Sequence, residues 1–450
     1  YVLTHEVISY VKKVERKVTM SFWIGSMQKH IEGFKELTTY NDIVNIAAPK
    51  EIFIPLMNGV STAFEVLVKE GDRVFVNTKV AVRNDRFHVP LFSPVSGVVK
   101  GIKKMMHASL KQVEHIIIEN DELYETTNSI PHFDLENATK EEIINFVKES
   151  GIVGMGGAGF PTYFKYLTPA TVHNVLINAV ECEPYITSDY RMMENYTQDF
   201  ITGFIALKKM ANAKEVHIAI KKSKKTLIKY IQEAIKPYPF ASIKEVDDVY
   251  PMGWERTLVY AIYKKRYDKI PCEVNVIVNN ATTAIALGQA INYQQGPIHK
   301  MVTVSGNGIK NPANVFVPVG TQANHIIKQL GGYTSEEITC VSGGPMMGKT
   351  MTNDLWVVTP YTNAITINKT EKIDSMTCLR CGTCNDHCPA GLLPVRINNA
   401  EQAKNIDLMT QLNTDLCIEC GLCTYVCPSK LEVTEGVRKA KRALALKKGA

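Results

Sequence analysis

The chain has 450 residues and a hydrophobic fraction of 45%, so it is long enough for about three domains with packed cores. Its net charge of +6 is mildly basic, and no stripe of basic and aromatic residues favours nucleic-acid binding. No run of about 18 apolar residues predicts a membrane-spanning helix, and the first residues lack the apolar core of a secretory signal, so we expect a cytoplasmic protein.

The N-terminal third alternates short apolar strands with turns. Turns are indicated at Gly71-Asp72 and Ser96-Gly97. The stretches at 68–74 and 93–99 resemble the barrel-sandwich fold of biotinyl and lipoyl domains. Because the lysine that is modified in those domains is not evident, a purely structural barrel is the simpler interpretation. Strands are predicted at residues 52–56, 64–68, 74–76, 80–82, 98–102 and 115–118.

Residues 141–300 alternate helices with buried strands, which predicts an α/β domain with a parallel sheet. The predicted helices are 139–150, 199–210 and 223–235, and the predicted strands are 175–177, 217–220 and 274–278. Residues 301–350 return to strands and turns, with strands at 301–305 and 314–319 and a helix at 322–330.

A glycine-rich loop follows the first of these helices. Residues 151–159 read Gly-Ile-Val-Gly-Met-Gly-Gly-Ala-Gly, which leaves backbone N–H groups uncovered by side chains. Such loops cradle phosphates, above all where a helix starts behind them, as 162–166 with Lys165 could do here. The spacing matches neither a dinucleotide fingerprint nor a P-loop, so by itself the loop is equally consistent with a tightly packed turn.

Polar residues follow the strand at 175–177. The sequence there is Asn178-Ala-Val-Glu181-Cys182-Glu183-Pro-Tyr. Side chains at the carboxyl end of a parallel strand lie where α/β proteins bind ligands. A solvated loop acid is the plain alternative for each carboxylate.

Two cysteine runs near the C-terminus predict one-electron chemistry. They are Cys378-x2-Cys-x2-Cys-x3-Cys388-Pro and Cys417-x2-Cys-x2-Cys-x3-Cys427-Pro, and both match the bacterial pattern for a [4Fe–4S] cluster. The fourth cysteine of such a run usually ligates the other cluster. We therefore assign Cys378, Cys381, Cys384 and Cys427 to one cluster, and Cys388, Cys417, Cys420 and Cys423 to the other.

Other uses of these cysteines fit less well. Zinc modules also pair CxxC motifs but do not usually run four cysteines at this spacing with a following proline. A disulfide framework is not expected in a long chain without a secretory signal. Of the remaining thiols, Cys272 and Cys340 are given no role. Residues 395–412, between the two cysteine runs, have a helical sequence pattern. This predicts a helical two-cluster domain rather than a compact two-hairpin ferredoxin.

The combined motifs resemble one family. Gly-x-Gly-Gly-Ala-Gly-Phe-Pro-Thr at 154–162, followed by Asn-Ala-x-Glu-x-Glu-Pro, resembles the flavin-bearing NADH-oxidising subunit of respiratory complex I. Glu-Cys-Glu-Pro-Tyr with Ser-Asp-Tyr-Arg at 188–191 is more similar to the C subunit of the Rnf complex, a bacterial membrane complex that couples ferredoxin and NAD. The stretches at 35–38, 250–258 and 343–348 extend the resemblance over most of the chain.

The resemblance implies a multidomain protein of the α/β and α+β classes with four parts. They are an N-terminal segment with a barrel-sandwich-like β domain (1–130), an α/β FMN- and NAD-binding domain like the complex I flavin subunit (131–298), a β-grasp-like SLBB module (299–365) and a helical two-[4Fe–4S] ferredoxin domain (366–450).

The resemblance also implies a site for non-covalent FMN and for NAD(H) as substrate. The loop amides and Lys165 would hold the FMN phosphate, Asn178 would contact the flavin, and the acids would border the flavin or nicotinamide. Hydride transfer to a flavin needs no general base, so no catalytic side chain is predicted. The cofactor-binding set is Gly154, Gly156, Gly157, Gly159, Lys165, Asn178, Glu181, Glu183 and Glu255.

The implied function is an NADH/ferredoxin oxidoreductase component. It would be peripheral on the cytoplasmic face of the bacterial membrane, with integral-membrane and ferredoxin-like partner subunits that transport Na⁺ or H⁺. Loops such as Gly253-Trp-Glu255-Arg and 279–284 depart from the family pattern. Two alternatives stay open: a soluble relative that serves a cobalamin or amino-acid reductase, and an electron-wire protein without flavin.

Overall fold

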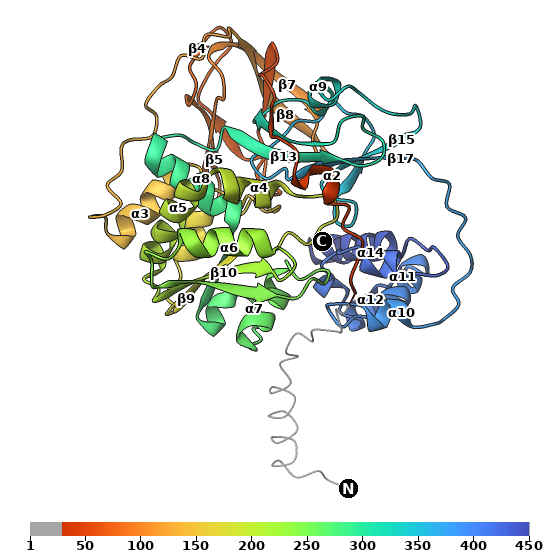
Figure 1. Cartoon of the computed structure of the whole chain (residues 1–450). Coiled ribbons are helices and arrows are strands. Elements are labelled where there is room, and N and C mark those ends of the chain that lie inside the picture. The colour runs from red at the N-terminus through yellow and green to blue at the C-terminus, as the bar shows by residue number, and fades with distance from the viewer. Residues whose placement is uncertain (1–28, 450) are drawn as a thin grey trace, which may run out of the picture. The chain divides into compact units, whose positions relative to one another are not determined.

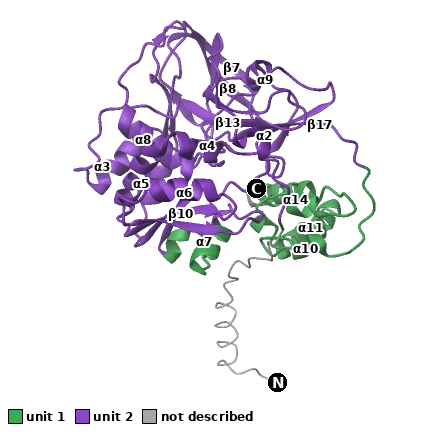
Figure 2. Cartoon of the chain, in the orientation of Figure 1, with its two compact units in different colours: residues 1–29, 256–274, 374–450 green, residues 30–255, 275–373 purple. Residues whose placement is uncertain are grey.

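The computed structural model describes residues 29–449, so the first part of the predicted N-terminal segment lies outside the described residues. The chain forms two compact units (Figure 2). The larger unit comprises residues 30–255 and 275–373, and the smaller one contains the segments 256–274 and 374–450. The glycine loop therefore belongs to the larger unit, and both cysteine runs belong to the smaller one.

Seven strands form the barrel-sandwich part as two antiparallel sheets, ordered β2-β8-β7-β4 and β3-β5-β6. Their branched side chains suit a pleated, half-buried surface, and Ile52, Val80, Ile116 and Ile118 are fully buried between the sheets. The six predicted strands are present with shifted ends, and β6 is additional. The bounds are β2 (Glu51–Pro55), β3 (Phe64–Val66), β4 (Arg73–Val74), β5 (Lys79–Asn84), β6 (His88–Phe92), β7 (Gly97–Met106) and β8 (Gln112–Asn120).

The predicted parallel sheet is confirmed, with the order β11-β10-β9-β12. Its strands β9 and β10 are labelled in Figure 1. The chain runs outward from β9 to β11 and then returns to place β12 on the other side of β9. This creates a switch point between β9 and β12, where Asn178 pairs in register with Asn280. The strands are β9 (Asn174–Asn178), β10 (Glu215–Lys221), β11 (Ala241–Val246) and β12 (Val276–Asn280).

Two glycines let a pair of helices beside this sheet approach closely. A Cβ at Gly203 of α5 would lie 1.8 Å from the Ala284 carbonyl oxygen of α8, and a Cβ at Gly288 of α8 would lie 1.9 Å from the Asp199 oxygen. Strand β11 and helices α4, α7 and α8 were not predicted. The helices are α3 (Lys140–Glu149), α4 (Ser188–Asn195), α5 (Thr197–Ala211), α6 (Lys225–Ala234), α7 (Glu255–Tyr263) and α8 (Ala281–Tyr293), with short 3₁₀ turns η1 (Thr162–Tyr166) and η2 (Pro271–Val274).

A third, six-stranded sheet has the order β1-β14-β13-β17-β15-β16 and packs around the buried Trp356. Strand β1 pairs with β14, so the segment that contains α2 (Glu36–Thr39) and β1 joins this sheet, although the sequence grouped it with the barrel-sandwich part. The other elements are β1 (Val44–Asn45), β13 (His299–Ser305), β14 (Ala313–Pro318), α9 (Ala323–Gln329), β15 (Ile338–Ser342), β16 (Lys349–Met351) and β17 (Ala364–Lys369).

The described residues after 373 are helical, as predicted, and form an internal repeat. Shifting the sequence by 39 positions aligns the first cysteine run with the second, α10 with α13, and the start of α11 with that of α14. Left-handed backbone recurs at equivalent positions, as at Arg380 and Glu419 (φ 56° and 57°) and at Gly382 and Gly421 (φ 81° and 79°). The elements are α10 (Thr383–Asp386), α11 (Pro394–Gln402), α12 (Ile406–Gln411), η3 (Thr414–Leu416), α13 (Leu422–Tyr425) and α14 (Val433–Gly449).

Candidate functional site

The eight cysteines of the two runs line two separate cavities in the smaller unit. Each cavity takes three cysteines from one run and the fourth from the other, which is the grouping that the sequence predicts. Among residues 29–449, no three His, Cys, Asp or Glu side chains are arranged to hold a single metal ion. Cys378, Cys381, Cys384 and Cys427 line one cavity, and Cys388, Cys417, Cys420 and Cys423 line the other.

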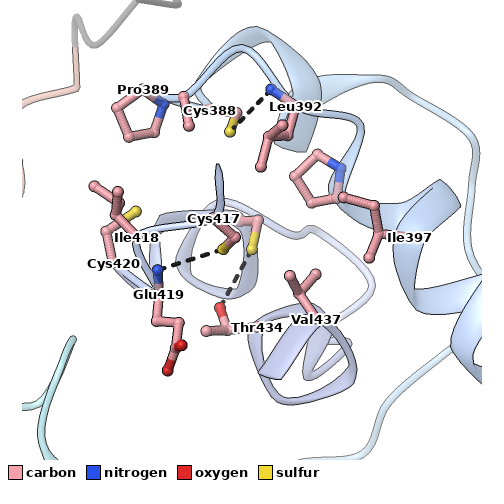
Figure 3. Close-up of a pocket in the computed structure, with 14 residues that line it drawn as sticks. Cys388, Pro389, Leu392, Ile397, Cys417, Ile418, Glu419, Cys420, Thr434 and Val437 are labelled. Atoms are coloured by element: carbon pink, nitrogen blue, oxygen red, sulfur yellow. Dashed lines mark hydrogen bonds between the residues drawn. The ribbon is translucent and has the colours of Figure 1, made fainter. Parts of the chain in front are cut away.

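Hydrogen bonds to sulfur accompany this grouping. The Glu419 amide donates to Cys417 Sγ at 3.3 Å, and the Leu392 amide donates to Cys388 Sγ at 3.4 Å, so two distant loops turn their sulfurs to one cavity (Figure 3). Burial raises the pKa of the Cys423 thiol to about 12, so a cationic partner is needed to hold it as thiolate. Four thiolates with N–H donors to sulfur fit an iron–sulfur cluster.

The glycine loop lies at the switch point of the parallel sheet. A Cβ at Gly156 would lie 3.1 Å from the Asn280 side chain, which caps α8. The Met155 amide donates to Thr283 Oγ1 at 2.9 Å, and Lys165 Nζ donates to a carbonyl of β12 at 2.8 Å. Open α/β sheets bind their ligands at such switch points.

Only part of the loop offers free backbone amides. The Gly154 amide donates to the Phe160 carbonyl at 2.7 Å, and the Gly159 amide donates to the Gly154 carbonyl at 3.2 Å. The amides of 156–158 donate to no described group, and these three residues are exposed. Adjacent free amides form a concavity that suits a phosphate. The α-helix expected behind the loop is instead the five-residue 3₁₀ turn η1, so the amides, rather than a helix end, favour an anion here.

Glu181 is nearly buried and faces a lysine from the N-terminal segment. Its Oε1 accepts from the Asp189 amide at 2.8 Å, and its Oε2 lies 3.9 Å from Lys35 Nζ. Lys35 Nζ also donates to the main-chain carbonyls of Glu183 and Ile186. Burial raises the pKa of Glu181 and lowers that of Lys35, and their mutual attraction opposes both shifts.

Glu183 holds a loop of the six-stranded-sheet part. Its Oε1 accepts from the amides of Met346 and Met347, both at 2.8 Å, and its Oε2 accepts from the Tyr250 hydroxyl at 3.2 Å. Burial raises the pKa of Glu183, and these hydrogen bonds oppose the shift. The carboxylate is thus occupied by protein donors, and its predicted place beside a flavin or nicotinamide stays a prediction.

Asn178 and Glu255 lie near the same end of the sheet. Asn178 Nδ2 donates to the Gly253 carbonyl at 2.8 Å, and its Oδ1 accepts from the Val180 amide at 3.0 Å, so this side chain holds the turn after Tyr250 against the end of β9. Glu255 is the first residue of α7 and is partly exposed. Their contacts to cofactor stay predictions.

Sequence reasoning missed a buried polar network beneath the glycine loop. Lys300 is 2% exposed, and its Nζ donates to the Met155 carbonyl at 3.2 Å. Asp189 accepts from Asn280 Nδ2 at 2.6 Å and from Thr282 Oγ1 at 2.7 Å. A lysine directly before the apolar strand 301–305 was the available signal for Lys300, but only the packing shows that it is buried.

In the part of the chain that the structure describes, no helix is long and apolar enough to cross a membrane.

Four family models match successive segments of the chain between residues 28 and 428. They are an RnfC barrel sandwich hybrid domain (28–123), a Nuo51 FMN-binding domain (147–289), an SLBB domain (301–350) and a 4Fe-4S dicluster domain (370–428). The predicted classes of the four parts are thereby confirmed. Among solved structures, a chain of an NAD⁺-reducing [NiFe]-hydrogenase aligns with 72% of this chain and 69% of its own at a TM-score of 0.49 and 16% identity, a likeness that carries no conclusion.

Three curated relatives share about a third of their aligned residues with this chain. The C subunit of the Na(+)-translocating ferredoxin:NAD(+) oxidoreductase complex of Acetobacterium woodii is 32% identical over 88% of this chain and 91% of the relative. The C subunit of the ion-translocating oxidoreductase complex of Rhodobacter capsulatus is 33% identical over 84% of this chain and 75% of the relative. The same subunit of Vibrio cholerae is 31% identical over 84% of this chain, which spans only 50% of that longer relative. The chain therefore belongs to the family of C subunits of Rnf-type ion-translocating oxidoreductase complexes.

Proposed function

We propose that the chain is the NAD-linked subunit of an Rnf-type complex, passing electrons between NAD(H) and ferredoxin through FMN and two [4Fe–4S] clusters. The observation that carries this proposal is the pair of four-thiol cavities in a chain that also presents free loop amides at the switch point of a parallel sheet. Bound FMN would supply the step from hydride transfer to single electrons.

The residues of the chain would bind and orient the cofactors. The amides of 156–158 would donate to the FMN phosphate, and the buried Lys300 would hold the loop through the Met155 carbonyl. The eight cysteines would ligate the clusters in the crossed grouping. The N–H donors to Cys388 and Cys417 would help to set one cluster's potential.

Partner subunits would transport the ion, and this subunit would lie on the cytoplasmic face of the membrane. The relatives' names include both a Na(+)-translocating and a proton-translocating complex, so the similarity favours neither ion. Co-purification from native membranes tests the assembly. Integral-membrane subunits should accompany the chain, whereas their absence from active preparations would favour the soluble relative.

The cofactor proposal is tested with the full chain reconstituted with iron, sulfide and FMN. We expect flavin and cluster absorbance that NADH bleaches. Ala158→Pro should weaken FMN binding at least about tenfold because it removes a free amide at a residue without positive φ, while iron content stays unchanged. Ala158→Gly keeps its amide and is the matched control. A wild-type chain that loads clusters but takes up no FMN would refute the enzyme and leave an electron wire.

A further inference from the structure

The two halves of the cysteine repeat cover their cavities to different extents. Leu379 is 63% exposed, whereas Ile418, at the equivalent position, is partly buried. Cys381 is exposed, whereas its equivalent, Cys420, is 8% exposed. Because the backbones of the two runs follow the same conformations, this difference comes from what packs on them.

A longer helix accounts for the difference. Helix α14 continues for 17 residues, and its Lys441 donates to the Cys417 carbonyl and to Glu419, both at 2.8 Å. Arg438 also lies 3.3 Å from Glu419. The equivalent helix α11 has nine residues and ends at Gln402, the counterpart of Lys441. The loop of the first run therefore lacks a comparable tether among the described residues.

The uncovered rim is apolar and positively charged. Met376 is 58% exposed, and its amide donates at 3.0 Å to the carbonyl of Ser429, which lines the cavity together with Leu379. Arg380 and Arg396 line the same cavity, are exposed, and form no ion pair with a described residue. None of the lining residues is acidic, and the exposed Asp386, at the end of α10, is the carboxylate that follows the first run's loop in sequence.

We propose that an acidic iron–sulfur carrier protein docks on this rim and exchanges electrons with the cluster held by Cys378, Cys381, Cys384 and Cys427. We call the surface formed by Met376, Leu379, Arg380 and Arg396 the docking rim. This inference rests on the proposed function and names the cluster through which electrons cross to the partner. In each encounter one electron passes between the carrier's cluster and this cluster of the chain. One of the two is oxidised as the other is reduced, and no bond forms or breaks.

Charge complementarity supports an acidic occupant. Unpaired arginines beside exposed apolar side chains steer an anionic partner and then pack against it. The other use of the two arginines is to offset the thiolate charge of the cluster itself. The two uses predict different measurements, because steering changes an association rate and its salt dependence, whereas charge compensation changes the cluster potential.

The test mixes reduced, net-negative two-[4Fe–4S] ferredoxin with the oxidised, reconstituted full chain in a stopped-flow instrument. We expect a second-order rate that falls as ionic strength rises. The double variant R380E/R396E should lose about tenfold or more and reverse the salt dependence. The double variant R380Q/R396Q should lose less and flatten it. Leu379→Ser should slow transfer without altering the salt slope.

The matched control K404E/K439E changes two exposed lysines of the same unit by the same net charge. It should keep most of the rate. Equal loss in control and rim variants, or an unchanged rate in the rim variants, would overturn the docking rim. A lower cluster potential with an unaltered salt slope would assign the arginines to charge compensation instead. Failure of the wild-type chain to load clusters, or of NADH to bleach it, would refute the proposed function itself.

Discussion

Buried charges beneath the glycine loop determine its local shape. Lys300 is 2% exposed and donates to the Met155 carbonyl, and burial lowers the pKa of its ammonium group to about 8. The carboxylates of Asp189 and Glu181 oppose this shift. A buried ammonium is costly unless it is paired, so its retention beside the loop indicates that it shapes the loop rather than adds stability.

Replacing Lys300 by Met should flatten the dependence of stability on pH. The folded-state pKa of about 8 lies below the ordinary 10.5, so the contribution of Lys300 is present above pH 10.5 and is lost as pH falls through 8. The shift corresponds to about 3 kcal/mol. Urea unfolding at pH 7.5 and pH 10 should show a smaller difference between the two pH values in the variant.

The exposed Lys328 on α9 provides the control for this measurement. Lys328→Met should keep the wild-type difference between the two pH values, because it removes a surface lysine and leaves the buried network beneath the glycine loop unchanged. If Lys300→Met keeps that difference as well, Lys300 binds its proton equally in the folded and unfolded chain, and its ammonium group is solvated rather than buried.

At the scale of elements, one carboxylate joins the loop after β9 to the loop after β15. Glu183 accepts the amides of Met346 and Met347, and a Cβ at Gly344 would lie 2.0 Å from its side chain. The two glycine-rich loops therefore have different structural roles. The loop at 151–159 presents free amides, and the loop at 343–348 makes room for the Glu183 side chain.

Glu183→Ala should release the loop at 343–348. Two amides would lose their acceptor, at a cost of about 2–4 kcal/mol in unfolding free energy. Hydrogen exchange at Met346 and Met347 should accelerate. Glu183→Gln keeps one acceptor oxygen and should lose less protection. If Glu183→Ala leaves this exchange unchanged and alters only the KM for NADH, the residue contacts the nicotinamide instead of holding the loop.

At the scale of the whole molecule, the crossed cysteine grouping makes the two halves of the repeat depend on each other. Each cavity takes one cysteine from the other run, so neither half holds four thiols alone. The division of the chain into parts near residues 130, 298 and 365 stays a proposal.

Double substitutions distinguish crossed from uncrossed ligation. In the crossed arrangement, Cys388→Ser and Cys417→Ser remove ligands from the same cluster, so the pair should lose no more iron than the more damaging single substitution. Cys388→Ser with Cys378→Ser should damage both clusters. Iron analysis and low-temperature EPR of the reconstituted chain report this. The reverse pattern would show that each run ligates its own cluster.

Elements of the fold could be predicted where neighbouring residues in the sequence carry the pattern that specifies them. The cysteine runs, the alternating strands and the glycine loop are patterns of neighbouring residues, and each appears where it was expected. Strand β11 was missed because Ala-Ser-Ile-Lys-Glu-Val at 241–246 carries little apolar alternation, and α8 was missed because small residues such as Gly288 obscure its pattern. Both are formed by packing against neighbours.

The sequence by itself determined the chemistry: eight thiols at cluster spacing, a loop without side chains, and the parallel sheet that carries it. Only the tertiary structure decided which groups are available. It left the amides of 156–158 free while occupying those of Gly154 and Gly159, gave Glu183 protein partners, buried Lys300, and covered one thiol cavity more than the other. The physical reason is that spacing along a chain selects the type of ligand, whereas burial and hydrogen bonding depend on segments far apart in sequence.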